Sequence, residues 1–176
     1  MQEAEVIMLV RAGEIDAFTD IVEQYQSPII RYLYRLTGDY EAARDLAQDT
    51  FIQAYKGILK TDSALSFRAW LYRIATNIAL QHFRSKRIRS FLPFTPKEEQ
   101  YLSYDNTDTH DEAMSIEQAL HKIPEKQRTY MVLHFIEGFK YREIAETLGV
   151  SEESVRKRIS RGRQQFIRFY RGGDVA

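Results

Sequence analysis

Residues 141–163 read Tyr141-Arg-Glu-Ile-Ala-Glu-Thr-Leu-Gly149-Val-Ser151-Glu-Glu-Ser-Val-Arg-Lys-Arg-Ile-Ser-Arg-Gly-Arg163. Apolar residues in the first part recur at positions i, i+3, i+4 and i+7, the spacing of one buried helix face. Gly149 ends this helix, because glycine readily adopts the left-handed conformation of a C-cap. Ser151 is a typical N-cap, and negative charge follows where the helix dipole favours it. The stretch therefore predicts a helix-turn-helix.

The second helix of this pair is basic on its outer surface. Val155 and Ile159 are spaced to point inward. From Ser151 to Arg171 two glutamates stand against seven basic residues, a balance of +5: Arg156, Lys157, Arg158, Arg161, Arg163, Arg168 and Arg171. Such a surface gains affinity by displacing counterions from phosphates, and Arg and Lys can read guanine edges in the major groove. A solvated amphipathic helix would explain the charges alone, but the preceding helix and corner favour DNA binding.

Charge is segregated along a chain of zero net charge. Residues 1–90 carry +1, residues 91–121 carry −6 and residues 122–176 carry +5. The 176 residues, 44% of them hydrophobic, can bury one moderate core or two small ones. The absence of cysteine excludes disulfides, thiolate metal sites and thiol nucleophiles. The first residues lack a basic signal-peptide start, and no apolar run approaches the ~20 residues of a spanning helix, so we expect a soluble cytoplasmic protein.

Apolar residues recur at helical spacing in four segments of the first half, at residues 6–13, 15–38, 39–57 and 67–89. Pro28 is expected to bend the second segment. Gly38 and Asp39 are expected to end one helix and cap the next. The fourth segment ends in a basic cluster.

The periodic pattern fails after residue 90 and resumes near residue 113. Residues 91–111 contain two prolines and an acidic, polar run, which is typical of a flexible linker. Helix resumes at residues 113–120 and restarts with Pro124 at its first position. No alternating run predicts a strand, so we predict an all-α fold. Its expected parts are a helical domain at 1–90, an acidic linker at 91–111 and a helix-turn-helix domain at 112–176.

Two motif sets resemble a known family. Asp45-Leu-Ala-Gln-Asp-Thr-Phe-Ile-Gln-Ala-Tyr55 and Phe67-Arg-Ala-Trp-Leu-Tyr-Arg-Ile-Ala-Thr-Asn77 resemble region 2 of the extracytoplasmic-function (group IV) sigma factors of bacterial RNA polymerase. The helix-turn-helix, preceded by Ile123-Pro124, is similar to region 4 of that family. Order, spacing and length agree over nearly the whole chain. The resemblance implies an alternative-type sigma factor that directs core RNA polymerase to promoters, helps open DNA for transcription initiation and binds an inhibitory anti-sigma factor.

The resemblance also implies a polymerase-binding surface. Asp45, Gln48, Asp49 and Phe51 match the segment that docks on the clamp helices of the largest catalytic subunit. The polar residues fall within about one helical turn and suit a basic partner. Ile52 is the alternative apolar anchor, because Phe51 also fits the buried stripe of its own helix.

In region 2 the resemblance places recognition of the minus-ten element in helix 67–89 and in the preceding loop, residues 61–66. Trp70 shares the apolar stripe and is expected to be core, although stacking on a base is the alternative. Off that stripe we expect exposed side chains that suit a melted strand: Tyr72, Arg73, Thr76 and Asn77. Phosphate contacts are expected from Arg84, Lys86 and Arg87, whose charges also complement the end of the helix dipole.

In region 4 the resemblance assigns the minus-thirty-five element to the second helix of the pair. The residues expected to enter the major groove are Ser154, Arg156, Lys157, Arg158 and Arg161. Lys140 and Arg163 are expected to hold phosphates. Glu152 and Glu153 are expected to complement the helix dipole, with contacts to cytosine as the alternative.

The sequence offers little for catalysis. His82, His110, His121 and His134 lack metal-ligand spacing, and the aspartates at 105, 108 and 111 lack the glycine and glutamate of a calcium loop. No Gly-rich phosphate loop or nucleophile elbow occurs. We therefore expect no enzyme activity, no cofactor and no metal. The rival hypothesis is an autonomous helix-turn-helix regulator that grips an operator without polymerase. A third, an anti-activator that binds only proteins, fits poorly with the cationic helix.

Overall fold

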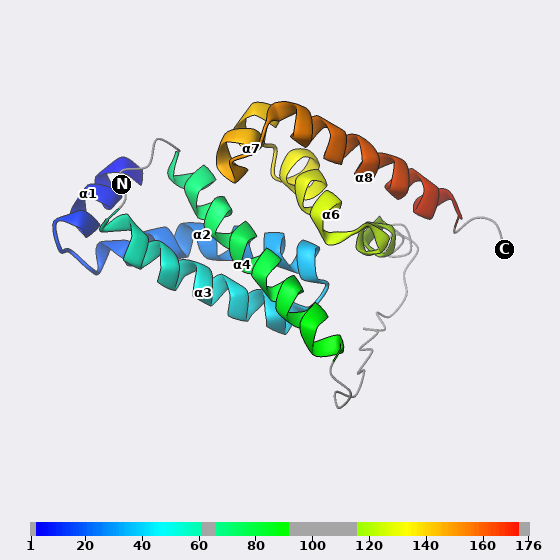
Figure 1. Cartoon of the computed structure of the whole chain (residues 1–176). Helices are drawn as coiled ribbons and strands as arrows, with labels where there is room; N and C mark the ends of the chain where they lie inside the picture. The colour runs from blue at the N-terminus through cyan, green and yellow to red at the C-terminus, as the bar shows by residue number, and fades with distance from the viewer. Residues whose placement is uncertain (1–2, 61–65, 92–115, 173–176) are drawn as a thin grey trace, which may run out of the picture.

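The computed structural model describes residues 3–60, 66–91 and 116–172, and the regular elements in these ranges are all helices (Figure 1). The N-terminal half, residues 3–91, contains α1 (Glu3–Arg11), α2 (Ala17–Thr37), α3 (Tyr40–Ile58) and α4 (Phe67–Ser90). The C-terminal half, residues 116–172, begins with a helix at 116–122 and continues with α6 (Glu125–Met131), η1 (Val132–Ile136), α7 (Tyr141–Leu148) and α8 (Glu152–Gly172). The predicted all-α fold is confirmed.

The helix boundaries follow from local chemistry. Gly38 has a φ of +72° and its N–H donates to the carbonyl of Tyr34, so α2 ends there. The carboxylate of Asp39 accepts from the backbone N–H of Ala42 at 3.0 Å and caps α3. Pro124 does not begin α6, because it occupies the N-cap position directly before Glu125. The sequence predicted Pro124 as the first residue of the helix, but it lies one residue before that position.

The N-terminal half is a bundle in which α2 packs against α1, α3 and α4. Its centre is fully buried and includes Ile29, Leu33 and Leu71. Trp70 packs on α3 at Gly57, where an added Cβ would lie 2.8 Å from the indole ring. Trp70 is thus half-buried and packs against the core, whereas the sequence predicted it inside the core.

The C-terminal half contains the predicted helix-turn-helix. Gly149 has a φ of +65° and ends α7, and the Ser151 hydroxyl accepts from the N–H of Ser154 at 3.1 Å at the start of α8. Val155 and Ile159 are buried between α8 and the rest of this half. The sequence pattern thus predicted both the corner and the buried face.

A π-helical turn was not expected. In η1 the N–H of Glu137 donates to the carbonyl of Val132 at 3.0 Å, five residues back. Gly138 follows with a φ of +77°. The N–H of Phe139 donates a hydrogen bond to the carbonyl of Leu133 at 2.9 Å. The widened turn ends in a corner formed by Glu137, Gly138 and Phe139, which precedes α7.

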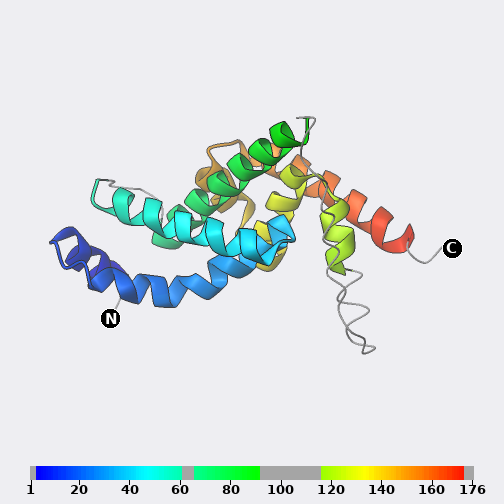
Figure 2. The same cartoon turned by 90° about the horizontal axis from the view of Figure 1, so that it is seen from below.

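The two halves pack against each other and share one hydrophobic core. Helix α4 contacts both α6 and α7, and α2 contacts α6 and η1. Figures 1 and 2 show α4 lying between α3 on one side and the C-terminal half on the other. The expected linker falls outside the described residues except for Phe91, as does most of the loop at 61–66.

Candidate functional site

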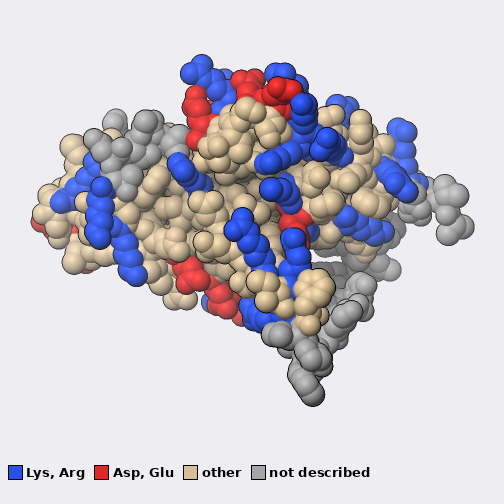
Figure 3. Space-filling model, in the orientation of Figure 1, with Lys and Arg blue, Asp and Glu red and all other residues tan. Residues whose placement is uncertain are grey.

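The outer surface of α8 is cationic, as predicted. Arg156, Lys157, Arg161 and Arg163 are exposed, and Ser154 is half-buried. Figure 3 shows basic side chains gathered over the α8 side of the molecule. The glutamates of the first turn also form i,i+4 ion pairs, Glu152 with Arg156 at 3.4 Å and Glu153 with Lys157 at 2.6 Å. These exposed pairs contribute little to stability, but they hold both cations near the N-terminal turn of α8.

Arg158 differs from its neighbours, because it is only half-exposed. Its guanidinium lies over the ring of Tyr130, 4.8 Å from the centroid, and donates a hydrogen bond to the hydroxyl of that tyrosine. Tyr130 belongs to α6 and is buried. The sequence pattern did not predict this contact between α8 and α6. Lys140 is exposed at the N-cap of α7, close to the corner before the helix pair.

The α3 surface carries the residues predicted to bind polymerase. Asp45, Gln48, Asp49 and Ile52 are exposed and lie at i, i+3, i+4 and i+7, so they share one helix face. Phe51 does not belong to this face. Only 8% of it is exposed, and it is part of the core, so its prediction as a surface anchor is corrected.

Two of the four residues predicted to be exposed on α4 are buried. Arg73 and Asn77 are exposed as expected, but Tyr72 is 1% exposed and Thr76 is fully buried. Thr76 shares a hydrogen bond of 2.7 Å with the hydroxyl of Tyr32 in α2. Tyr72 is covered by the C-terminal half, since its ring packs against Phe139 at a centroid distance of 5.2 Å. The expectation of exposure is wrong at these two positions because the burial comes from elements distant in sequence.

The end of α4 remains accessible. Arg84, Lys86 and Arg87 are exposed. Arg87 forms an ion pair of 2.8 Å with Glu125 at the start of α6, so one member of this cluster also joins the two halves. Both proposed uses of the cluster, phosphate contact and complement to the helix dipole, stay open.

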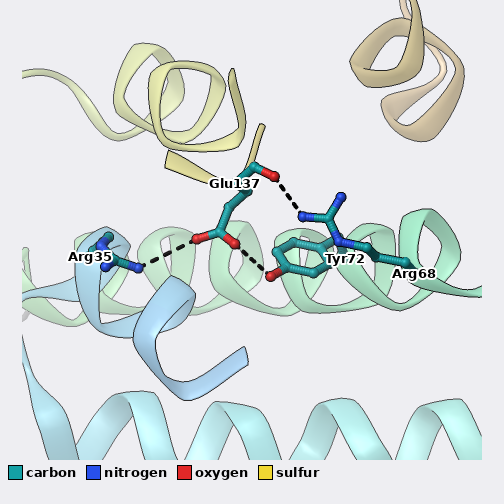
Figure 4. A network of polar contacts seen from close by, with 4 residues as sticks. All are labelled: Arg35, Arg68, Tyr72 and Glu137. Atoms are coloured by element: carbon teal, nitrogen blue, oxygen red, sulfur yellow. Dashed lines mark hydrogen bonds and ion pairs between the residues drawn. The ribbon is translucent and has the colours of Figure 1, made fainter. Parts of the chain in front are cut away.

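A polar network joins the halves at the corner after η1 (Figure 4). We call Arg35, Arg68, Tyr72 and Glu137 the Glu137 network. The hydroxyl of Tyr72 donates to the Glu137 carboxylate at 2.6 Å, and Arg35 forms an ion pair with the same carboxylate at 3.4 Å. Arg68 donates to the backbone carbonyl of Glu137 at 2.6 Å. Burial, with the Glu137 carboxylate as the next cause, raises the pKa of Tyr72, so the phenol stays a donor.

Sequence analysis missed this network. Arg35, Arg68 and Glu137 are ordinary surface residues by sequence, and Glu137 is 65 residues beyond Tyr72. The helices α2 and α4 bring Arg35 near Arg68 and Tyr72, and the packing of the two halves adds Glu137.

The described residues contain no cluster of three or more histidine, aspartate or glutamate side chains arranged to hold a metal ion. None of the helices in these ranges has both the length and the apolar content needed to cross a membrane.

Comparison with known proteins places both segments in one family. The family description "Sigma-70 region 2" matches residues 21–88, and "Sigma-70, region 4" matches residues 113–166. The chain is 35% identical over 170 residues to the ECF RNA polymerase sigma factor SigW of Bacillus subtilis, covering 90% of this chain and 91% of that protein. The chain belongs to the extracytoplasmic-function family of RNA polymerase sigma factors.

Other sigma factors give the same result. The RNA polymerase sigma-H factor of Pseudomonas aeruginosa is 31% identical over 93% of this chain and 91% of its own length. The solved structure of CnrH in complex with the cytosolic domain of CnrY has a TM-score of 0.68 at 24% identity, with 92% of each chain covered. The sigma factor RpoE in complex with the anti-sigma factor NepR from Bartonella quintana has a TM-score of 0.65 at 20% identity, covering 88% of this chain and 96% of that one. These two structures show that the fold is shared.

Within this sigma factor, the Glu137 network joins the two matched regions. Arg35, Arg68 and Tyr72 lie in region 2 and Glu137 lies in region 4. The α3 face belongs to region 2 and the start of α8 to region 4.

Proposed function

We propose that this chain is an alternative-type sigma factor that binds core RNA polymerase through α3 and promoter DNA through α4 and α8. The observation that carries the proposal is that regions 2 and 4 follow one another in one chain. Region 2 contains α3 and α4, and region 4 contains the helix pair α7 and α8. A sigma factor is an initiation factor, and we propose that catalysis belongs wholly to the polymerase. Residues 1–90 and 112–176 are proposed as its domains and residues 91–111 as their linker.

The proposed polymerase contact is the exposed α3 face of Asp45, Gln48, Asp49 and Ile52. Two carboxylates and an amide share this helix face with one apolar side chain that is 46% exposed, an arrangement that suits a basic partner with a small apolar recess. Phe51 supports this face from inside the bundle and is not proposed to touch the partner.

For region 4 we propose that Ser154, Arg156, Lys157, Arg158 and Arg161 face the minus-thirty-five element in the major groove. Lys140 and Arg163 are proposed to hold phosphates on either side. For region 2 we propose Arg73 and Asn77 as direct contacts to the melted minus-ten strand, and Arg84, Lys86 and Arg87 as phosphate contacts. Tyr72 and Thr76 are not accessible in this arrangement of the two halves.

The remaining proposals concern the setting. Relatives with this fold are seen in complexes with CnrY and with the anti-sigma factor NepR, and we propose an inhibitory anti-sigma partner for this chain also. We further propose that it works in the cytoplasm, where polymerase and DNA are, without a cofactor.

Run-off transcription and mobility shift on a pool of promoter fragments from the native genome would test the function. Purified protein alone, core polymerase alone and the mixture form the three arms. Because each region alone offers a small interface, we expect specific initiation only in the mixture. Tight, sequence-specific shifts by the protein alone, with no initiation on addition of core, would establish the autonomous regulator instead.

A further inference from the structure

We propose that Arg35, Arg68 and Tyr72 form an anion site of region 2 that takes a backbone phosphate of the melted promoter strand, and that Glu137 of region 4 occupies this site while the two halves are packed together. Glu137 and DNA would then compete for one site. The inference rests on the proposed function and adds a regulation of its region 2 surface.

The site has the donors that an oxyanion needs. In the packed chain one carboxylate oxygen of Glu137 accepts from the Tyr72 hydroxyl at 2.6 Å and the other pairs with Arg35 at 3.4 Å. Arg68 lies beside them, with its guanidinium 5.1 Å from the centre of the Tyr72 ring. One guanidinium group and a phenol thus hold the carboxylate, and the Arg68 guanidinium donates to the backbone carbonyl of the same residue at 2.6 Å (Figure 4). Such charge-assisted bonds are made as readily to a phosphate oxygen as to a carboxylate.

The site is built and largely withdrawn from solvent. The Glu137 side chain is 11% exposed and that of Arg35 is 31% exposed. When region 4 leaves, Arg35 loses the carboxylate that it pairs with and Arg68 loses its backbone acceptor. A ligand of negative charge is therefore favoured at this place once the halves separate.

The surroundings favour a nucleic acid over a small acidic partner. Helix α4 carries six basic residues and no acidic one: Arg68, Arg73, Arg84, Lys86, Arg87 and Arg89. Arg68 and Tyr72 occupy its first turns, Arg73 and Asn77 lie exposed beyond them, and the basic cluster lies at its end. A single strand running along α4 would meet cations near both ends of the helix, as strand-binding grooves require.

Region 4 excludes this strand while it is packed on α4. Phe139 covers Arg68, whose guanidinium lies 4.2 Å from the ring centre, and its ring also packs on Tyr72. The α3 face proposed for polymerase is exposed in the same arrangement. Polymerase could therefore bind first, and separation of the regions would then free the anion site for DNA.

The experiment compares Glu137→Gln with Arg35→Gln, using Glu146→Gln as the control. Glu146 pairs with Arg142 on the outer face of α7 and has no contact with region 2 among those that the structure gives for it. Because the chain has no cysteine, donor and acceptor dyes can be attached to Gln53→Cys and Ser160→Cys, at exposed positions on α3 and α8. Energy transfer then reports closure. The DNA probe is a fluorescent 12-nucleotide oligothymidylate, whose binding reports phosphate contacts without base reading.

Both variants remove the same ion pair, so both should lower energy transfer. Only Glu137→Gln should also gain affinity, by about tenfold, since Arg35→Gln opens the chain but loses part of the anion site. In the Glu137→Gln background, adding Arg68→Gln should abolish the gain and reduce the slope of log affinity against log salt by about 0.7, the loss of one phosphate contact. Circular dichroism verifies that each variant is folded.

Equal gains for Glu137→Gln and Arg35→Gln would overturn the anion site, because opening alone would explain the binding. Unchanged energy transfer in Glu137→Gln would overturn the competition. Failure of the proposed function would give a different result. Neither the wild type nor any variant would then initiate transcription with core polymerase, whether or not the oligothymidylate binds.

Discussion

Arg158 lies on the basic helix α8, where it stacks on the ring of Tyr130 and donates a hydrogen bond to its hydroxyl. A long arginine loses side-chain entropy when it binds DNA, and a ring that restricts it beforehand reduces that cost. The stacked ring and the hydroxyl contribute separately, so they can be tested separately.

We expect Tyr130→Phe to lower the affinity of the polymerase-bound sigma factor for its promoter by about threefold to tenfold, because the ring stays and only the hydrogen bond is lost. Fluorescence anisotropy of a labelled promoter duplex would measure it. The salt dependence should not change, since no phosphate contact is removed. Arg158→Gln should lose more, with relaxed base preference at one position. Equal affinities for Tyr130→Phe and the wild type would show that the hydroxyl does not position Arg158.

At the scale of single helices, α3 has two faces with opposite tasks. Phe51 packs inward and Ile52, the next residue, points to solvent. Sequence spacing left both as candidate anchors, and only the packing of α3 separates them.

Phe51→Ala should therefore destabilise the protein by about 3–5 kcal/mol, the usual loss for a buried phenylalanine. Ile52→Ser should leave the urea midpoint nearly unchanged and weaken binding to core polymerase, measured by competition with a labelled sigma factor. If neither variant weakened binding to core polymerase, α3 would no longer be a candidate for the interface.

Gly162 allows helix α8 to pack closely against α6. A Cβ at Gly162 would lie 2.5 Å from the sulfur of Met131 and 3.3 Å from Cβ of Gln127. Glycine inside a helix costs about 1 kcal/mol relative to alanine, so its presence at a buried position indicates a close approach.

Gly162→Ala should destabilise the protein by about 1–2 kcal/mol, because the overpacking exceeds the gain in helix propensity. Ser160→Ala, at an exposed position of the same helix, is the control and should be neutral or slightly stabilising. Thermal unfolding of both variants would decide it. A stabilised Gly162→Ala would mean that Met131 moves aside at no cost.

At the scale of the whole molecule, His121 lies where the two halves meet. Its ring is 3.1 Å from the place of a Cβ on Gly38, and its Nδ1 accepts from Arg128 at 2.5 Å. Burial, and then the Arg128 guanidinium, lower the pKa of His121 to about 4. The folded chain therefore keeps this imidazole neutral at pH values where the unfolded chain protonates it.

Stability should be unaffected by His121 above about pH 7 and should fall as the pH drops from about 6.5 towards about 4, because in that window the unfolded state binds the extra proton. As the ring is only partly buried, we expect no more than about 2 kcal/mol. Urea unfolding of the wild type and of His121→Gln at several pH values would measure their free energies of unfolding. The difference between the two proteins cancels the titration of the carboxylates that they share. Burial also lowers the pKa of His82, so part of the dependence should persist. Parallel curves for the two proteins would contradict the assignment.

Periodicity and capping chemistry were enough to predict the helices of both halves and the helix-turn-helix, since these depend on residues close in sequence. The exposure of Tyr72 and Thr76 was mispredicted because Phe139 and Tyr32, which cover them, come from other elements. The π-helical turn at 132–136 has no clear sequence signal, and it is this turn that precedes Glu137. Local pattern thus predicted the elements and the cationic helix, but not the contacts between the halves.

The ring of Phe139, 4% exposed between the halves, gives their separation a thermal signature. Exposing apolar surface to water raises the heat capacity, so opening should have a positive heat-capacity change. Apolar contacts weaken on cooling. The free energy of closure should therefore curve with temperature and pass through a maximum, so that both strong cooling and heating would favour the open chain.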